Sequence, residues 1–249
     1  MPTITLLLKV HNHHQLKIAE SHLKSMVKGL KVTTEISPNS REWLQLTTSG
    51  ADQTVAIRYL QEELGVCPTS WTQIEKFATF KGYISSITKT KILIDIGLPS
   101  NLDLVISLQH LQEELVEGRK MALKKIAELF GLCKNLPLTL KVTSIQEESQ
   151  GIQGMLPKKQ LKQYRSWIQT LLDRLIVLGA SLHEVKRAVR GTGSKRDVIN
   201  IESSSFLEHN LVCKLGTEAA GLIPKIGRKL PNTKLATFNS KSIWKLLKD

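Results

Sequence analysis

The clearest structural pattern in the sequence lies in FKGYISSITKTKILIDIG, residues 80–97. Isoleucines recur along two runs, at positions 84 and 87 and then at 92, 94 and 96, and a short TKT turn separates the runs. β-Branched residues on both sides of a short polar turn are typical of a β-hairpin. We therefore predict two antiparallel strands that form the first hairpin of a barrel.

The same stretch resembles the OB-fold of the repeats found in ribosomal proteins and translation factors. Gly82 lies in the first strand, the segment Asp95-Ile96-Gly97 closes the second, and a third strand ends at a short helix. The resemblance implies a five-stranded barrel. Its remaining strands are expected at residues 138–145 and 151–155. The sequence LPKKQL, which follows the second of them, matches the tail of such a repeat.

Two departures from the OB-fold pattern limit what the resemblance implies. A helical insert at residues 111–132 separates the third strand from the fourth. The aromatic residues on which such domains stack bases are replaced by Lys91 and Leu93, so Phe80 and Tyr83 are the rings that remain nearby. We expect an OB-like barrel with a helical insert, and we do not expect this barrel to stack bases.

The segment before the barrel follows a β-α-β-β-α pattern. Apolar residues alternate in a strand predicted at residues 3–8 and then recur with helical spacing. Asp52 and Gly65 are expected to cap a second helix at residues 53–64. A last strand at Trp71–Ile74 would complete a ferredoxin-like β-α-β-β-α-β domain, a fold whose open sheet face many RNA-binding domains use.

A second β-α-β-β-α-β pattern follows the barrel. It opens with a basic amphipathic helix at residues 158–173, which precedes the strand RLIVLGA. Ser181 and Glu184 have the spacing of a capping box, at the start of a helix that ends near Arg190. The later segments predict strands at VINIE and LVCKL, a short helix in GTEAAGLIPKIGRKL and a last strand at LATF.

These patterns predict an α+β protein of three modules. We expect a ferredoxin-like α+β domain at residues 1–75, an OB-fold-like barrel with a helical insert at 76–157 and a second, basic, ferredoxin-like α+β domain at 158–249.

Nearly all of the excess positive charge lies in the last hundred residues. The formal net charge is +13. Residues 1–76 hold 8 Lys and Arg against 7 Asp and Glu, residues 77–150 hold 9 against 8, and residues 151–249 hold 18 against 7. A compact protein with such an excess is typical of one that binds a polyanion. We expect the polyanion site in the third module.

The sharpest local feature is the loop RAVRGTGSKRD, in which glycines separate two arginines from a second basic pair. Such a loop can offer backbone N–H groups and cations to phosphates, although a glycine-terminated helix followed by a solvated turn has the same pattern. Two further basic groups could extend the surface. The predicted nucleic-acid-binding residues are Lys158, Lys159, Lys162, Arg165, Arg187, Arg190, Lys195, Arg196, Lys225, Arg228 and Lys229.

The sequence shows no spacing that demands a metal, a cofactor or a catalytic group. His11, His13 and His14 lie in a strand-to-helix turn where polar residues cap, without a cysteine or carboxylate placed to complete a coordination shell. No paired-carboxylate, Ser/His/Asp, P-loop or G-x-G-x-x-G pattern is present. We therefore expect no metal, no cofactor and no catalytic residue, and we leave open an enzyme whose site converges from distant positions.

The chain is expected to be cytoplasmic and not to enter a membrane. Cys67, Cys133 and Cys213 are odd in number and far apart, which indicates a reducing compartment. No apolar run approaches the ~20 residues of a spanning helix.

Five blocks of the sequence resemble an uncharacterised protein family of archaea, a domain of unknown function. The blocks are FKGYI, ILIDIG, LDRLIVLGA, KRDVINIE and EHNLVCKLGTEAAGLIPKIG. The resemblance spans most of the chain and implies an archaeal, cytoplasmic setting and a role in information processing. It supplies no functional residues.

We therefore predict a non-catalytic RNA-binding protein of translation or the ribosome, with ribosomal RNA and ribosomal proteins among its expected partners. Two alternatives stay open. One is a protein-interaction or assembly subunit without direct RNA contact, and the other is an RNA-processing or RNA-modifying enzyme.

Overall fold

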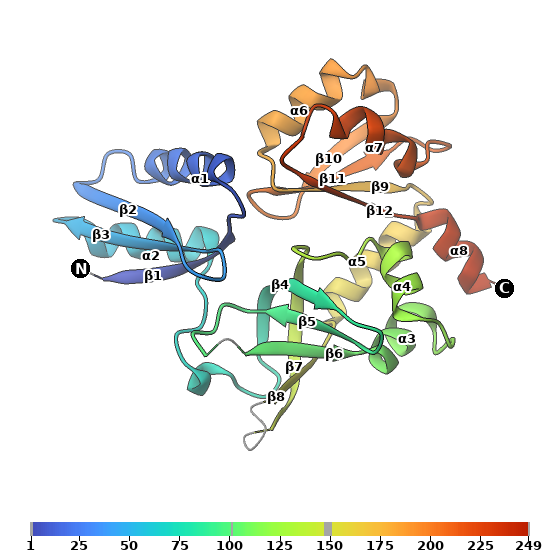
Figure 1. Ribbon diagram of the computed structural model, residues 1–249, viewed down its shortest axis with the longest axis horizontal. Coiled ribbons are helices and arrows are strands. Elements are labelled where there is room, and N and C mark those ends of the chain that lie inside the picture. Colours follow the sequence, from blue (N-terminus) through green and yellow to red (C-terminus); the bar gives the residue numbers. More distant parts are fainter. Residues whose placement is uncertain (1, 101, 147–150, 249) are drawn as a thin grey trace. The chain divides into compact units, whose positions relative to one another are not determined.

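The computed structural model describes residues 2–100, 102–146 and 151–248. The chain divides into two compact units, one of residues 1–73 with 97–101 and the other of residues 74–96 with 102–249 (Figure 1). The molecule is a mixed α+β protein with a closed barrel in its central region and flanking sheets, as the sequence predicts.

The N-terminal unit is a three-stranded antiparallel sheet with two helices. Its strands lie in the order β1-β3-β2. Buried positions alternate along β3 at Leu44, Leu46 and Thr48, because one face of the sheet forms the core. The elements are β1 (Thr3–Lys9), α1 (His13–Met26), β2 (Val32–Pro38), β3 (Trp43–Gly50), α2 (Gln53–Leu64) and a 3-10 helix (Trp71–Gln73).

The strand predicted at Trp71–Ile74 is wrong, because a short 3-10 helix occupies that position. The backbone N–H of Thr69 donates to the side chain of Gln73 at 2.8 Å, so local side-chain hydrogen bonds favour a turn over a strand. An earlier segment lies beside β1 instead, where the Cys67 N–H donates to the Thr5 carbonyl at 2.9 Å.

The start of α2 also differs from the prediction. Asp52 makes no side-chain hydrogen bond to the helix, and its Oδ2 accepts one from the Lys31 backbone N–H at 2.7 Å. Gly65 ends the helix as predicted, with a φ of 77° and its N–H bonded to the Gln61 carbonyl.

The central barrel closes in the order β4-β5-β6-β8-β7, with β7 paired back to β4. All pairs are antiparallel except β6 with β8. Gly82 sits where β4 meets β5, and a Cβ there would lie 2.5 Å from the Asp95 carbonyl oxygen, so the close approach requires glycine. The strands are β4 (Thr79–Ile87), β5 (Lys91–Asp95), β6 (Asp103–Ser107), β7 (Pro137–Gln146) and β8 (Gly151–Met155).

The predicted helical insert forms two helices rather than one. They are α3 (Leu108–Val116) and α4 (Leu123–Phe130). Glu117 ends α3 in the left-handed conformation, with a φ of 55°, and Gly118 follows with a φ of 79°. These two residues break the helix.

The C-terminal part is a four-stranded antiparallel sheet between two layers of helices. Its strands lie in the order β10-β11-β9-β12 and its elements follow the predicted β-α-β-β-α-β sequence. The sequence analysis did not predict the last helix, α8. The elements are α5 (Lys158–Gln169), β9 (Arg174–Leu178), α6 (Leu182–Gly191), β10 (Val198–Ser203), β11 (Glu208–Cys213), α7 (Ala219–Gly227), β12 (Lys234–Phe238) and α8 (Ser240–Lys248).

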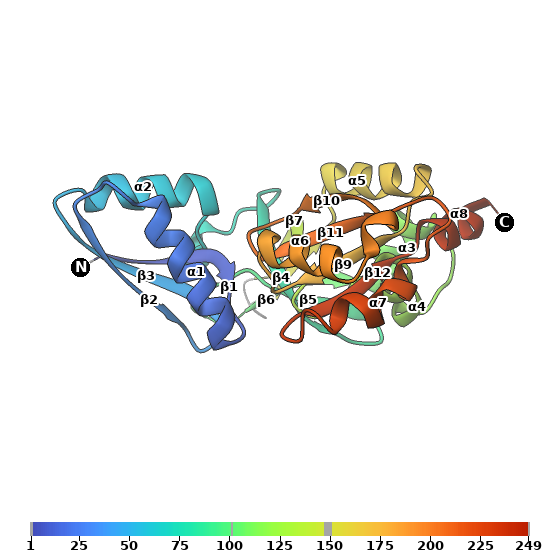
Figure 2. The same ribbon diagram turned by 90° about the horizontal axis from the view of Figure 1, so that it is seen from above.

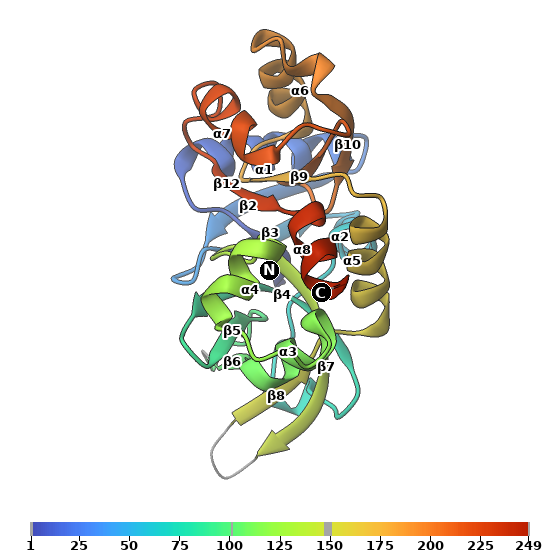
Figure 3. The same cartoon turned by 90° about the vertical axis from the view of Figure 1, so that its right-hand side faces the viewer.

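The two faces of this sheet pack against different helices (Figures 1 and 3). One face joins α6 and α7 in a core that includes Leu175, Val177 and Leu211. On the other face, Phe238 of β12 packs against the rings of Tyr164 and Trp167 in α5, with centroid distances of 5.8 and 5.1 Å. The helical insert packs on this second face through α4, so the barrel and the C-terminal sheet form one unit.

Candidate nucleic-acid interface

The basic loop predicted to contact phosphate follows α6, whose start is fixed by the predicted capping box. The Ser181 hydroxyl accepts from the Glu184 N–H, and the Glu184 carboxylate accepts from the Ser181 N–H at 2.8 Å. The helix ends at Thr192, and Gly193 then adopts a left-handed φ of 70° before a 3-10 turn at Ser194–Arg196. The capping box therefore sets where the helix begins, and the glycine allows the chain to turn back.

The backbone of this loop is largely bonded to itself. The N–H groups of Thr192, Gly193 and Asp197 donate to carbonyls of the same segment at 3.0–3.2 Å. The Thr192 hydroxyl also donates to the Ala188 carbonyl at 2.8 Å and contacts the hydroxyl of buried Ser194 at 2.9 Å. These N–H groups are therefore not free for a phosphate, and the loop can act on a polyanion through its side chains.

Four exposed cations surround two adjoining hollows beside α6. Lys186 and Arg190 line both hollows, Arg187 lines the first and Lys195 the second. Ile199 of β10 lies in the wall of the second hollow and is 57% exposed. No acidic side chain is among the described residues that line either hollow. We call the surface formed by Lys186, Arg187, Arg190 and Lys195 the α6 groove; Figure 2 labels α6 and β10, the elements beside which it lies.

Arg187 is held in the α6 groove by a neighbour on the same helix. Its Nη2 lies 2.7 Å from Nε2 of His183, one turn earlier. A guanidinium has no acceptor, so the arginine donates and the imidazole accepts. This contact orients the guanidinium along the helix and leaves its other N–H groups for a ligand.

The predicted residues of α5 lie away from the α6 groove. Their helix packs on the opposite face of the sheet through Tyr164 and Trp167, while α6 covers the first face. Arg165 lines a separate hollow. Three glutamates of the helical insert, Glu113, Glu114 and Glu117, line the same hollow and offset the charge of Arg165. The structure therefore divides the eleven predicted residues between two sides of the sheet. The four on α5, all exposed, are Lys158, Lys159, Lys162 and Arg165.

The remaining predicted residues lie on the side of α6 but outside the groove. Arg196 follows Lys195 in the 3-10 turn and is exposed. Lys225, Arg228 and Lys229 belong to the end of α7 and are exposed. Since α7 shares the apolar core of α6, these cations belong to the same helical layer as the α6 groove.

The sequence analysis missed two groups that the structure makes prominent. Lys186 lies one turn before Arg190, a spacing that could have revealed it. Phe77, just before β4, is 61% exposed with a left-handed φ of 71°, and the Nζ atoms of Lys76 and Lys141 each lie 5.1 Å from its ring centroid. Lys141 lies on the neighbouring strand β7, 64 residues later in the sequence, so no local pattern could have indicated its contact with Phe77.

Two more findings bear on the expected partners. Within residues 2–100, 102–146 and 151–248, no helix combines the length and the apolar character needed to cross a bilayer. Over the same ranges, no three His, Cys, Asp or Glu side chains converge as a set of metal ligands.

Comparison with solved structures gives partial overlaps. A chain of the a/eIF2alpha-aDim2p-rRNA complex from Pyrococcus horikoshii OT3 shares 12% identity over 50% of this chain and 70% of that chain, with a TM-score of 0.28. The intact alpha subunit of aIF2 from Pyrococcus abyssi shares 6% over 66% and 97%, with a TM-score of 0.28. A multidomain protein with nucleic acid binding domains from Streptococcus pneumoniae shares 7% over 86% and 52%, with a TM-score of 0.24.

Family models match most of the chain, although no curated protein matches it. The N-terminal domain of the DUF2110 family matches residues 3–70, the central domain matches 74–168 and the C-terminal domain matches 172–238. The boundary between the last two falls after α5, whose Tyr164 ring lies 5.8 Å from the ring of Phe130 in the helical insert. The chain therefore belongs to the DUF2110 family, an uncharacterised family as the sequence predicts.

Proposed function

We propose that this protein binds RNA without catalysing a reaction on it, and that the α6 groove holds the phosphate backbone. The observation that carries the proposal is the arrangement of Lys186, Arg187, Arg190 and Lys195 around two adjoining hollows, whose described lining contains no acidic residue. Neutralising several phosphates at once releases counterions, which gives an affinity that falls steeply with salt.

The shape of the groove favours a backbone over a base as its ligand. Long cationic side chains line it, and Ile199 is its exposed apolar residue. Side chains of this kind position a nucleic acid without reading its sequence. We place this activity in translation or on the ribosome of a cytoplasm, with ribosomal RNA as the expected ligand and ribosomal proteins as neighbours.

The division of the basic residues between two faces provides a matched control for the test. A groove variant would change Lys186, Arg187, Arg190 and Lys195 to Ala, and a control variant would change Lys158, Lys159, Lys162 and Arg165 to Ala. Each variant removes four positive charges from exposed positions of the same unit. A general effect of net charge is therefore the same in both.

The experiment is a titration of RNA binding against salt for the wild type and both variants. We expect the groove variant to lose affinity together with about three to four units of the log K versus log[salt] slope, and the control variant to lose much less. Equal losses in the two variants would contradict the groove as the site. If the wild type binds no structured RNA at low salt, the protein-interaction alternative takes its place.

The enzyme alternative has one observation in its favour. A lysine and a glutamate, both with shifted pKa values, converge in a pocket on the other face of the C-terminal sheet. Convergent ionisable groups of this kind are found in active sites and in recognition sites. The contacts of this pocket favour recognition of a ligand over catalysis.

A further inference from the structure

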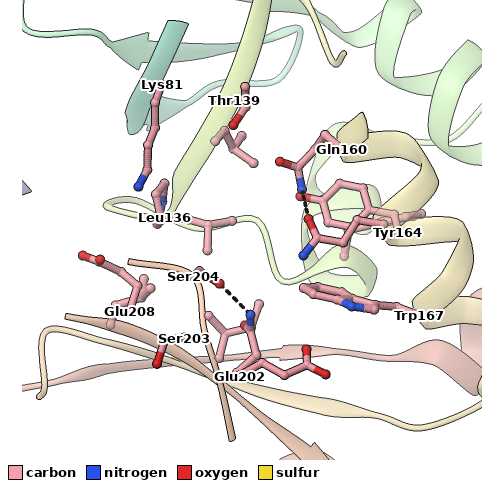
Figure 4. A pocket seen from close by; sticks show the side chains of 17 residues that line it. Lys81, Leu136, Thr139, Gln160, Tyr164, Trp167, Glu202, Ser203, Ser204 and Glu208 are labelled. Carbon is pink, nitrogen blue, oxygen red and sulfur yellow. Dashed lines mark hydrogen bonds between the residues drawn. The ribbon is translucent and has the colours of Figure 1, made fainter. Parts of the chain in front are cut away.

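A polar pocket of about 280 Å³ lies between the barrel and the C-terminal sheet, within one compact unit (Figure 4). The barrel strands β4 and β7 form one wall, α5 a second, and the strands β9, β10 and β11 the floor. None of the cations of the α6 groove lines this pocket. It is a separate site on the opposite face of the sheet.

The centre of the pocket is a buried carboxyl group that lacks a full set of partners. Glu208 of β11 is 5% exposed, and its Oε2 has no hydrogen-bond partner among the described residues. Burial raises the pKa of this carboxyl, while a hydrogen bond from Ser205 and the charge of Lys81 act in the opposite direction. An unpaired acceptor inside a protein carries a free-energy cost that a ligand N–H group can offset.

A donor from the barrel faces this acceptor. Lys81 of β4 extends from the opposite wall, and its ammonium points toward the Glu208 carboxyl (Figure 4). Burial lowers the pKa of Lys81, and the charge of Glu208 partly restores it. The pocket thus presents one acceptor and one donor to the same small space.

The rest of the lining suits a flat ring with a polar edge. Leu136, Ile176 and Leu178 supply apolar surface, and the rings of Tyr164 and Trp167 border it. Amide groups flank this surface, and they are already oriented by bonds within the protein. Gln160 donates to Gln163 at 3.2 Å, and Asn210 donates to the Ser204 hydroxyl at 2.7 Å.

We propose that this pocket binds one unpaired nucleobase through an edge on which an N–H group lies next to an acceptor. In uracil and hypoxanthine the ring N–H donates to Oε2 of Glu208, and Lys81 donates to the carbonyl oxygen. Adenine and cytosine offer the same pair when the base is turned over, with the amino group as donor and the unprotonated ring nitrogen as acceptor. A uracil or hypoxanthine whose ring N–H is methylated lacks the donor that Glu208 needs. A volume of about 280 Å³ accommodates one base.

This inference goes beyond the proposed function, because base recognition in the pocket does not require the α6 groove. The base could come from a free nucleoside or from a nucleotide turned out of an RNA strand. Both sources present the same edge, and the experiment separates them.

The test uses the full chain and nucleosides, which carry no phosphate for the α6 groove. Uridine and inosine are titrated by calorimetry, with 3-methyluridine and 1-methylinosine, which lack the ring N–H, as the mismatched pair. The variants are Glu208→Leu and Lys81→Met, and the four-residue groove variant serves as control. Far-UV circular dichroism confirms that each variant is folded, and Glu208→Gln provides a second, nearly isosteric change.

We expect uridine and inosine to bind, and the changes at Glu208 and Lys81 each to weaken binding by about tenfold or more. The groove variant should bind uridine normally even though it loses RNA, which separates this proposal from the proposed function. If nucleosides do not bind but single-stranded RNA binds the wild type better than the Glu208→Leu and Lys81→Met variants, the base comes from RNA. Equal binding of the methylated and unmethylated nucleosides, or binding of nucleosides and RNA that is unaffected by both residues, would overturn the proposal.

Discussion

The two faces of the C-terminal sheet differ in polarity and in the site that each supports, although both belong to the same four strands. Along β11, Leu211 faces α6 and α7, whereas its neighbour Asn210 and the more distant Glu208 face α5 and the barrel. Successive side chains of a strand point to opposite sides, so one strand supplies an apolar core on one face and polar groups on the other. The first face carries the helix that displays the α6 groove, and the second forms the floor of the polar pocket.

The two faces therefore present two kinds of site. Exposed cations on a helical layer suit a backbone that every RNA shares. Buried and incompletely bonded groups suit a ligand of defined hydrogen-bonding pattern, because a wrong partner leaves them unpaired. Substitutions on one face should therefore leave the site on the other face intact.

The largest effect is expected from removing an aromatic ring on the pocket face. Phe238 is fully buried, and its ring lies 5.1–5.8 Å from the rings of Phe130, Tyr164 and Trp167. Phe238→Ala should lower the free energy of unfolding by about 3–5 kcal/mol, since the surrounding rings relax only partly into the cavity that the change leaves. Urea denaturation measures the change.

A matched cavity on the other face gives the control. Leu211→Ala should cost about 2–5 kcal/mol from the core beneath α6 and α7. At a temperature where both variants are folded, Phe238→Ala should weaken uridine binding and Leu211→Ala should not. If both variants lose uridine equally, the two faces are not independent.

The next effect is the loss of stability caused by the buried carboxyl group of Glu208. The folded pKa of Glu208 lies above its ordinary value, so the folded state binds a proton more tightly than the unfolded state. Its contribution to stability is therefore lost as the pH rises from the unfolded pKa through the folded one. Glu208→Gln should raise the free energy of unfolding at pH 7 by about 1 kcal/mol or more.

The pH dependence separates this effect from a general improvement in packing. At pH 4 the advantage of Glu208→Gln should shrink, because the wild-type carboxyl is then largely protonated in both states. Urea denaturation at the two pH values provides the measurement. An advantage of equal size at both would show that the charge of Glu208 is not its cause.

A smaller effect is expected at the start of the helix that displays the α6 groove. Ser181→Ala removes the hydroxyl that accepts from Glu184 N–H and donates to the Glu184 carboxylate at 2.8 Å. The change should cost about 1 kcal/mol in unfolding experiments. Ser181→Asp retains a capping acceptor, and a cost as large as that of alanine would contradict the capping role.

Local patterns in the sequence predicted most of the elements because each leaves its signal within a few residues. The capping box at Ser181 and the glycine at the end of α2 are contacts between near neighbours. The strand at Trp71–Ile74 failed because hydrogen bonds of the side chains stabilise a turn there. The short α8 was missed, although Ile243 within it is fully buried.

The candidate sites were only partly predictable for a different reason. The charge excess of the third module located the basic residues but not the face on which each lies. That depends on the packing of Tyr164 and Trp167 against Phe238, which are distant in the sequence. The pocket joins Lys81 to Glu208 across more than a hundred residues, and neither residue has a local pattern that singles it out.

The smallest expected effect concerns the single groove cation that the sequence analysis missed. Lys186 lines both hollows, so Lys186→Ala should remove one phosphate contact and lower the salt slope of RNA binding by about 0.7–0.9 units. Lys162→Ala, an equal change of charge on α5, should leave the slope nearly unchanged. The measurement is fluorescence anisotropy across a salt series. Equal slopes for the two single variants would mean that RNA binding depends on the overall charge of the module rather than on the α6 groove.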